Sequence, residues 1–143
     1  MTHPDAATAL LNTLLPGDGA DWPAAGDLGL APRMAEMAAL APGGPEALDW
    51  VLGALPADFA RHTQDAREDA LRALEAAQPD RFGQIVTAAY NAYYTDPRVR
   101  DLIARLTGYP NRPPQPEGYA LEPFDESLLA AVRARGPIWR QVG

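Results

Sequence analysis

The side chains in this sequence that could carry out chemistry are few and far apart. The two histidines, His3 and His62, stand alone, so neither belongs to an HxxxH or HExxH pair that would bind zinc. The only serine, Ser127, lacks a nearby histidine and a Gly-x-Ser-x-Gly context, and we expect it to start a helix rather than act as a nucleophile. These residues predict no catalytic centre, and we expect the chain to be noncatalytic.

Three acidic residues in the middle of the chain are spaced so that they can share one helical face: Asp65, Glu68 and Asp69. Such a group could bind a hard cation, but a solvated helix surface has the same spacing. No glycine-containing calcium loop accompanies the three carboxylates. The sequence therefore favours a charged surface over a metal site.

Missing residue types exclude further chemistry. All twelve basic residues are arginine and there is no cysteine. These absences exclude lysine Schiff bases, the P-loop lysine, thiol catalysis and thiolate metal sites. The formal net charge is -7 and the arginines are dispersed, which argues against binding to nucleic acid or to an anionic membrane surface.

No stretch of the sequence is apolar over the roughly 18 residues that suggest a transmembrane helix, so we expect no membrane insertion. The first residues lack a positively charged segment before their apolar stretch, as an export signal would require. We therefore expect the chain to be cytoplasmic, although export together with a partner stays open.

Apolar residues recur at helical spacing in almost every segment, and prolines and glycines separate the segments. This pattern predicts an all-α fold, a compact bundle of about six or seven short helices. Expected helices run from Pro4 to Leu15, from near Pro32, from Pro45, from the cap Thr63 to about Ala77, from the cap Asp80, from Asp96-Pro97 to the terminator Gly108, and briefly from the cap Asp125.

The helix after Asp80 has the clearest core pattern and is expected to be central. Its predicted inward residues are Phe82, Ile85, Val86, Ala89, Tyr90 and Tyr93. In the other helices the predicted inward residues include Met34, Met37, Leu40, Ala66, Leu71, Leu102, Leu106, Leu128, Leu129 and Val132.

Prolines dominate the sequence between Tyr109 and Phe124, where they favour an extended polyproline path over helix or sheet. We therefore predict a bundle domain at residues 1–108, and a proline-rich arm with a short C-terminal helix and tail at 109–143. The arm could cover its own bundle or embrace another protein, and the sequence leaves both open.

Exposed tyrosines and arginines at the end of the bundle and along the arm are of the types enriched in protein interfaces. The residues that we predict to bind a partner are Tyr94, Asp96, Pro97, Tyr109, Arg112, Tyr119, Phe124 and Trp139.

Three segments, in this order, resemble the gluconate 2-dehydrogenase subunit 3 family, which comprises small accessory subunits of flavin dehydrogenases. The segments are LLNTLLPGDGADWPAAGDLGL, REDALRALEAAQPDRFGQIVTAAYNAYYTDPRV and LTGYP. The positions that match the motifs of the family are Pro16, Gly17 and Asp18, then Tyr93, Tyr94, Asp96 and Pro97, and finally Gly108, Tyr109 and Pro110.

The resemblance implies a noncatalytic subunit that binds and stabilises a large FAD-dependent oxidoreductase of the GMC type, acting on a sugar, glycoside or other alcohol. The FAD would belong to the partner, and this chain would hold no cofactor. Family members commonly begin with a twin-arginine export signal, which is missing here and favours a cytoplasmic heteromer. The family's glycine-rich continuation after Asp-Pro is also replaced, by Arg98-Val99-Arg100.

Two other functions stay open from the sequence. The chain could be a stand-alone helical ligand-binding protein or enzyme, with a pocket between bundle and arm that uses Tyr94, Arg112 or His62. It could also be a homo-oligomer whose arms exchange between protomers.

Overall fold

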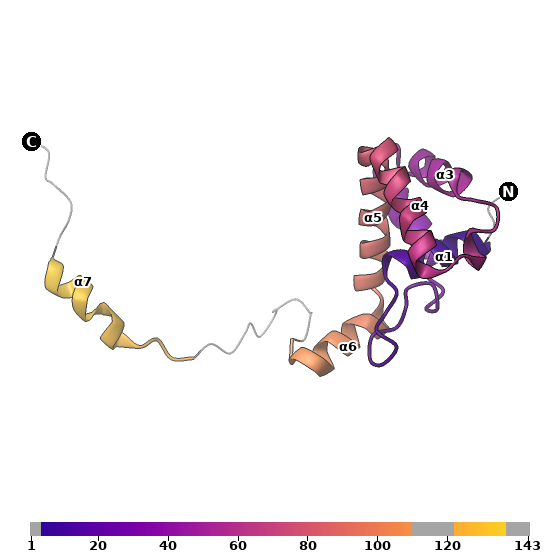
Figure 1. The fold of residues 1–143 in the computed structure, drawn as a ribbon. Helices are drawn as coiled ribbons and strands as arrows, with labels where there is room; N and C mark the ends of the chain where they lie inside the picture. The colour runs from indigo at the N-terminus through magenta and orange to yellow at the C-terminus, as the bar shows by residue number, and fades with distance from the viewer. Residues whose placement is uncertain (1–3, 110–121, 137–143) are drawn as a thin grey trace, which may run out of the picture. The chain divides into compact units, whose positions relative to one another are not determined.

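The computed structural model describes residues 4–109 and 122–136, and all regular structure within these ranges is helical (Figure 1). The all-α fold expected from the sequence is therefore confirmed for the described residues. The elements in order are α1 (Pro4–Leu14), α2 (Ala31–Ala38), α3 (Gly44–Ala54), η1 (Phe59–Arg61), α4 (Gln64–Ala77), α5 (Pro79–Tyr94), α6 (Pro97–Thr107), η2 (Glu126–Leu129) and α7 (Ala130–Arg135).

The chain divides into two compact units, Met1–Asn111 and Arg112–Gly143. The sequence predicted this boundary after Gly108. Most of the predicted proline arm, including Arg112 and Tyr119, lies outside the described residues, as does the predicted tail with Trp139.

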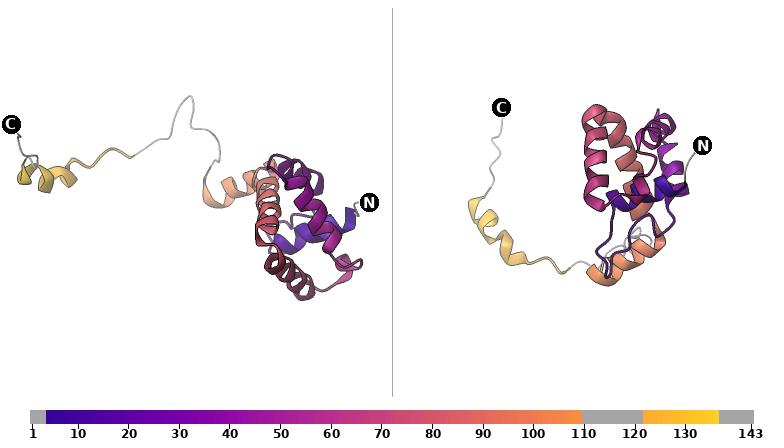
Figure 2. Two further views of the ribbon diagram at one scale, coloured as in Figure 1. Left: turned by 90° about the horizontal axis from the view of Figure 1, so that it is seen from above. Right: turned by 45° about the vertical axis from the view of Figure 1, so that its right-hand side comes forward.

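Helix α5 is central to the first unit, as expected. It packs against α2, α3 and α4 and also contacts α1 and α6. The single residue Gln78 joins α4 to α5, and the two helices pack against each other (Figure 2). The buried side chains of α5 are Phe82, Ile85, Ala88, Ala89, Ala92 and Tyr93. Three of these six are alanines, whose small side chains let neighbouring helices approach closely.

The core of the first unit joins helices that are distant in sequence. Its largest fully buried side chains are Phe59, Leu10, Leu11, Met34, Ile85, Val51 and Val99. Burial of one such side chain contributes about 1.5–3 kcal/mol to folding. Because these residues come from α1, α2, α3, η1, α5 and α6, the core holds the loops between these helices in place.

Several predicted helix boundaries are confirmed. The Thr63 hydroxyl accepts a hydrogen bond from the Ala66 amide at 3.4 Å, so Thr63 caps α4. The Asp96 carboxylate accepts one from the Arg98 amide at 2.9 Å. Gly108 ends α6 with a positive φ of 72°, which a residue without a Cβ adopts at little cost.

The predicted cap at Asp80 is wrong. Pro79 is the first residue of α5 and Gln78 is the N-cap, with no side-chain hydrogen bond. Proline favours the first helical position because it needs no amide partner there and its φ is already helical. The helix therefore begins earlier than expected, and Asp80 lies inside its first turn.

Several residues expected to face the core are exposed. Tyr90 is 46% exposed, because Ala88 and Ala92 extend the buried side of α5 away from it. Leu40 is 77% exposed, because α2 ends at Ala38 and the chain turns before the next helical turn forms. Two further predicted core residues, Ala66 and Leu106, are also exposed.

The second unit was also expected to bury its apolar residues. Instead, Leu128 and Val132 are exposed and Leu129 is only half-buried, and neither η2 nor α7 contains a buried residue. The cap expected at Asp125 is confirmed, since its carboxylate accepts a hydrogen bond from the Ser127 amide at 2.9 Å. Local capping signals thus accompany this helical segment, in which no residue of η2 or α7 is buried.

Candidate functional site: a tyrosine corner beside an open groove

The turn between α5 and α6 is held by a dense set of hydrogen bonds around Asp96. Besides capping α6, its carboxylate accepts bonds from Arg98 Nε at 2.9 Å and Arg98 Nη2 at 2.8 Å. The side-chain hydrogen bond from Arg98 is the largest cause that lowers the pKa of Asp96 below its ordinary value. Asp96 therefore stays charged at neutral pH and fixes the direction in which α6 leaves α5.

The loop that follows α1 docks against this corner. The Tyr93 hydroxyl donates a 2.8 Å hydrogen bond to the carbonyl oxygen of Pro23. Arg98 Nη2 donates a second bond, of 2.9 Å, to the carbonyl oxygen of Leu28. In each pair the two residues are 70 positions apart in the sequence. The loop after α1 and the corner between α5 and α6 therefore lie in direct contact.

The loop has a defined internal structure. The Asp18 carboxylate accepts 2.8 Å hydrogen bonds from the backbone amides of Ala20 and Trp22, and these amides lower the pKa of Asp18. Gly17 has a φ of +72°, and a Cβ at this position would collide with the carbonyl oxygen of Trp22. At the other end of the loop, Asn12 Oδ1 accepts a 2.6 Å bond from the Gly26 amide.

Three tyrosines from the end of α5 form an aromatic cluster, which we call the tyrosine corner (Tyr90, Tyr93 and Tyr94). Tyr93 is only 3% exposed, and burial is the main cause that raises its pKa. Tyr94 packs edge-to-face on Tyr93, with ring centroids 5.2 Å apart, and on Tyr90 at 6.1 Å. The buried Tyr93 ring therefore orients Tyr94, which is 45% exposed and in turn packs on the exposed Tyr90.

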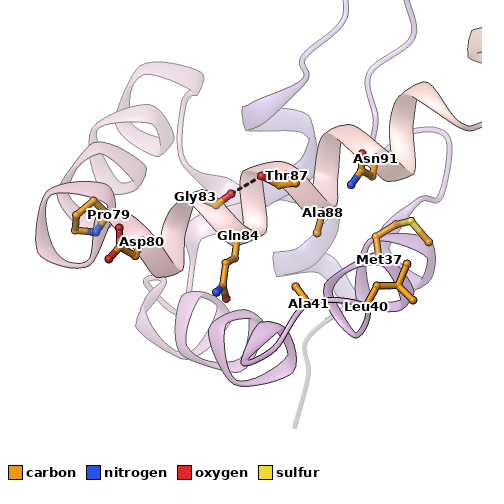
Figure 3. A pocket seen from close by; sticks show the side chains of 10 residues that line it. All are labelled: Met37, Leu40, Ala41, Pro79, Asp80, Gly83, Gln84, Thr87, Ala88 and Asn91. Carbon is orange, nitrogen blue, oxygen red and sulfur yellow. Dashed lines mark hydrogen bonds between the residues drawn. The ribbon is translucent and has the colours of Figure 1, made fainter.

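An open groove of about 560 Å³ lies between α5 and the segment that ends α2 (Figure 3). The residues that line it are Met37, Leu40, Ala41, Pro79, Asp80, Gly83, Gln84, Thr87, Ala88 and Asn91. The groove residue Thr87 precedes Tyr94 by seven positions, and residues seven apart lie on one helical face. The groove and the exposed tyrosines therefore share the solvent-facing side of α5.

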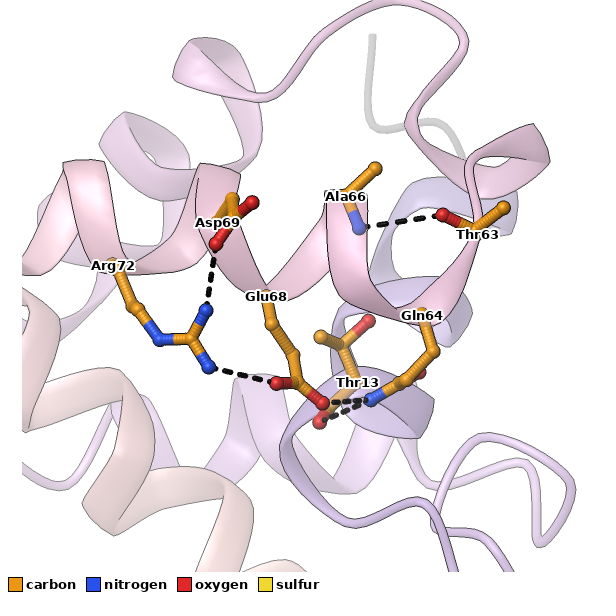
Figure 4. A network of polar contacts seen from close by, with 7 residues as sticks. All are labelled: Thr13, Thr63, Gln64, Ala66, Glu68, Asp69 and Arg72. Carbon is orange, nitrogen blue, oxygen red and sulfur yellow. Dashed lines mark hydrogen bonds and ion pairs between the residues drawn. The ribbon is translucent and has the colours of Figure 1, made fainter.

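Two of the three acidic candidates of α4, Glu68 and Asp69, belong to a polar network (Figure 4), and the third, Asp65, is exposed. Arg72 pairs with Glu68 at 2.9 Å and with Asp69 at 2.7 Å. Gln64 Nε2 donates to Glu68 at 2.9 Å and to the carbonyl oxygen of Thr13 at 3.3 Å. Across residues 4–109 and 122–136, no group of three or more acidic, histidine or cysteine side chains is arranged to hold a metal ion. Glu68 and Asp69 thus form a charged helix surface paired with arginine.

The other candidates for chemistry also have structural partners. His62 Nε2 lies 3.1 Å from the Asp58 carboxylate, one turn earlier in the chain. Ser127 lies in the first turn of η2, next to its cap, which confirms the expectation that it starts a helix. His3 lies outside the described residues.

The predicted partner-binding residues differ in their exposure to solvent. Tyr94, Pro97, Tyr109 and Phe124 are exposed, and Tyr94 and Pro97 flank the same corner. The side chain of Asp96 is largely covered, so it positions the corner rather than presenting a surface.

Two exposed residues were not predicted from the sequence: Tyr90, which packs on Tyr94, and Leu40, which lines the groove. The spacing of Tyr90 one helical turn before Tyr94 was the signal that could have identified the first. No sequence spacing indicated that Leu40 is exposed, because its exposure depends on the end of α2 at Ala38.

No protein-family model, curated protein or solved structure gives a significant match to this chain. Among the described helices, none has both the length and the apolar character needed to cross a membrane.

Proposed function

We propose that this chain is a noncatalytic small subunit that binds and stabilises a large FAD-dependent oxidoreductase of the GMC type. The partner oxidises a sugar, glycoside or other alcohol, and it holds both the FAD and the catalytic residues. The observation that supports this most is the contact of Tyr93 with Pro23. It joins two of the three segments that resemble the gluconate 2-dehydrogenase subunit 3 family into one local structure.

The surface beside this contact is suited to protein binding. Tyr90 and Tyr94 offer large amphipathic rings whose orientation is already restricted by edge-to-face packing. Restricted side chains lose less conformational entropy on association, and buried tyrosines are frequent hot spots of interfaces. A subunit that binds only the folded large subunit stabilises that fold by mass action.

Co-expression with the open reading frames that flank its gene, followed by purification through a tag on this chain, tests the proposal. The expected product is a yellow complex in which a second, larger polypeptide carries the flavin absorbance. A matched preparation with Tyr90→Ser and Tyr94→Ser should retain much less of the large polypeptide.

Two outcomes would contradict the proposal. One is a colourless chain that never retains a flavin-bearing partner. The other is turnover of a small molecule by the isolated chain that a point substitution within it abolishes, which would favour a stand-alone enzyme. The cytoplasmic location expected from the sequence belongs to this proposal, and cell fractionation of the tagged chain with its partner tests it.

A further inference from the structure

We infer that the groove between α5 and the end of α2 receives an amphipathic segment of the large flavin subunit. The inference rests on the proposed function and specifies where the partner docks. The segment places an apolar side chain against Met37 and Leu40, a hydrogen-bond donor at Gln84 and a cationic side chain at Asp80.

The apolar end of the groove is formed by side chains that the backbone holds outward. Leu40 N donates to the carbonyl oxygen of Met37 at 3.2 Å, and Ala41 N donates to that of Ala38 at 3.1 Å. This tight turn leaves Leu40 largely exposed at the rim, next to the half-buried Met37. One exposed leucine is ordinary, but here it stands beside a second apolar side chain and the buried Ala88, so an apolar group can be enclosed on several sides.

Gln84 supplies an unpaired acceptor in the middle of the groove. Its Nε2 donates to the carbonyl oxygen of Pro42 at 3.4 Å, which sets the orientation of the amide. Its Oε1 is buried and accepts no hydrogen bond from any described residue. Buried acceptors are nearly always paired in folded proteins, so this oxygen is available to a donor from beyond the described residues. A backbone or side-chain N–H of a docked segment provides one.

Charge distinguishes the partner from a second copy of this chain. Asp80 lies at the end of the groove opposite Leu40 in Figure 3, and it forms no ion pair with another described residue. A second copy would carry the same net charge of -7 and would be repelled. A cationic side chain on the partner is attracted to Asp80, and this contact sets the direction in which the segment lies.

The groove is also continuous with the tyrosine corner. Thr87, Asn91 and Tyr94 follow one another at spacings of four and three residues along the exposed side of α5. One partner can therefore cover both the groove and the exposed tyrosines, as a single interface of ordinary size requires.

Three substitutions in the purified complex test this docking mode. Leu40→Glu should weaken binding of the large subunit by about tenfold or more, because it places a charge in the apolar end. Gln84→Met should weaken binding by roughly five- to tenfold. The urea midpoint of the isolated chain should stay about equal, since removal of an unpaired buried acceptor offsets the loss of the 3.4 Å bond to Pro42. Asp80→Arg should weaken binding in low salt, and this loss should shrink as salt is added.

Leu106→Glu is the matched control, because Leu106 is also an exposed leucine but lies on α6 outside the groove. It should change the dissociation constant by about twofold or less, as expected for a surface position outside an interface. Hydrogen exchange of the wild-type complex should show new protection in residues 37–41 and 80–91.

The outcomes separate this inference from the proposed function. If the wild-type chain binds no flavin subunit, the proposed function fails. If the complex forms but all three groove variants bind like wild type and residues 37–41 and 80–91 gain no protection, the docking mode is overturned while the proposed function stands. If the variants instead change self-association of the isolated chain, the occupant is a second copy and the inference is likewise wrong.

Discussion

The Tyr93 hydroxyl donates a 2.8 Å hydrogen bond to the carbonyl oxygen of Pro23, 70 positions earlier in the chain. This bond fastens the loop after α1 to the last turn of α5. Arg98 fastens the same loop at a second point, through the carbonyl oxygen of Leu28. The corner that we propose as the partner surface therefore depends on a loop that is distant from it in the sequence.

Replacing Tyr93 with Phe should lower the free energy of unfolding by about 1 kcal/mol, the usual net contribution of one hydrogen bond. The measurement is urea unfolding followed by circular dichroism. Tyr90→Phe is the control, because Tyr90 is on the same helix but its hydroxyl has no partner among the described residues. Equal stability of Tyr93→Phe and wild type would show that the Pro23 contact does not hold the loop.

Gly17→Ala should destabilise the first unit more than Gly19→Ala. Both glycines have a positive φ, 72° and 74°, so each substitution costs about 1 kcal/mol or more in backbone strain. Only at Gly17 does the added Cβ also collide with backbone, at the carbonyl oxygen of Trp22, whereas nothing lies within 4 Å at Gly19. Thermal unfolding of the two variants measures the difference, and equal losses would contradict the packed loop.

Asp96 should make stability depend on acid pH. Its pKa is lowered in the folded state, mainly by the Arg98 side chain, so the unfolded state binds more protons as the pH falls. The contribution of Asp96 is present above its ordinary pKa of about 3.9 and is lost as the pH falls through the lower folded value. Asp96→Ala should therefore cost about 1–2 kcal/mol at pH 7, as the loss of a helix cap does, and less below pH 3.

Urea unfolding at pH 7, 4 and 2 tests the prediction for Asp96. Asp125→Ala is the control, because Asp125 also caps a helix and has a lowered pKa but lies in the second unit. A stability gap between wild type and Asp96→Ala that is constant across this range would contradict the charge argument.

Tyr109→Ala should weaken the complex with the large subunit several-fold and leave the helicity of the bundle unchanged. Tyr109 follows the end of α6 and is exposed, so its ring contributes little to the core. We expect the same of Trp139, which lies outside the described residues. Parallel measurements of binding and far-ultraviolet circular dichroism test this, and equal loss of both would mean that these residues belong to the core.

A chain that ends at Asn111 should have the same thermal unfolding midpoint as the full chain, within about 2 °C. A difference of this size corresponds to a contribution of the second unit to the free energy of unfolding of under about 0.5 kcal/mol. All core residues of the described structure belong to the first unit, and η2 and α7 bury none. A much lower midpoint would show that residues beyond Asn111 stabilise the bundle.

Much of the fold followed from local sequence signals. Thr63, Asp96 and Gly108 were predicted as helix boundaries and act as such, because a cap is determined by the few residues next to it. The core stripe of Phe82 and Ile85 was likewise visible, since helical periodicity is a property of the chain itself. The error at Asp80 was also local, because the proline before it is the stronger start signal.

Only the tertiary structure decided which side of each helix is covered and which segments meet. Tyr90 fitted the core period but is exposed, because the packing of α2, α3 and α4 around α5 selects the side that carries Ala88 and Ala92. The groove and the contact of Tyr93 with Pro23 were also absent from any local pattern. Helical periodicity determines which residues share a face, whereas contacts between distant segments determine whether that face meets the core or the solvent.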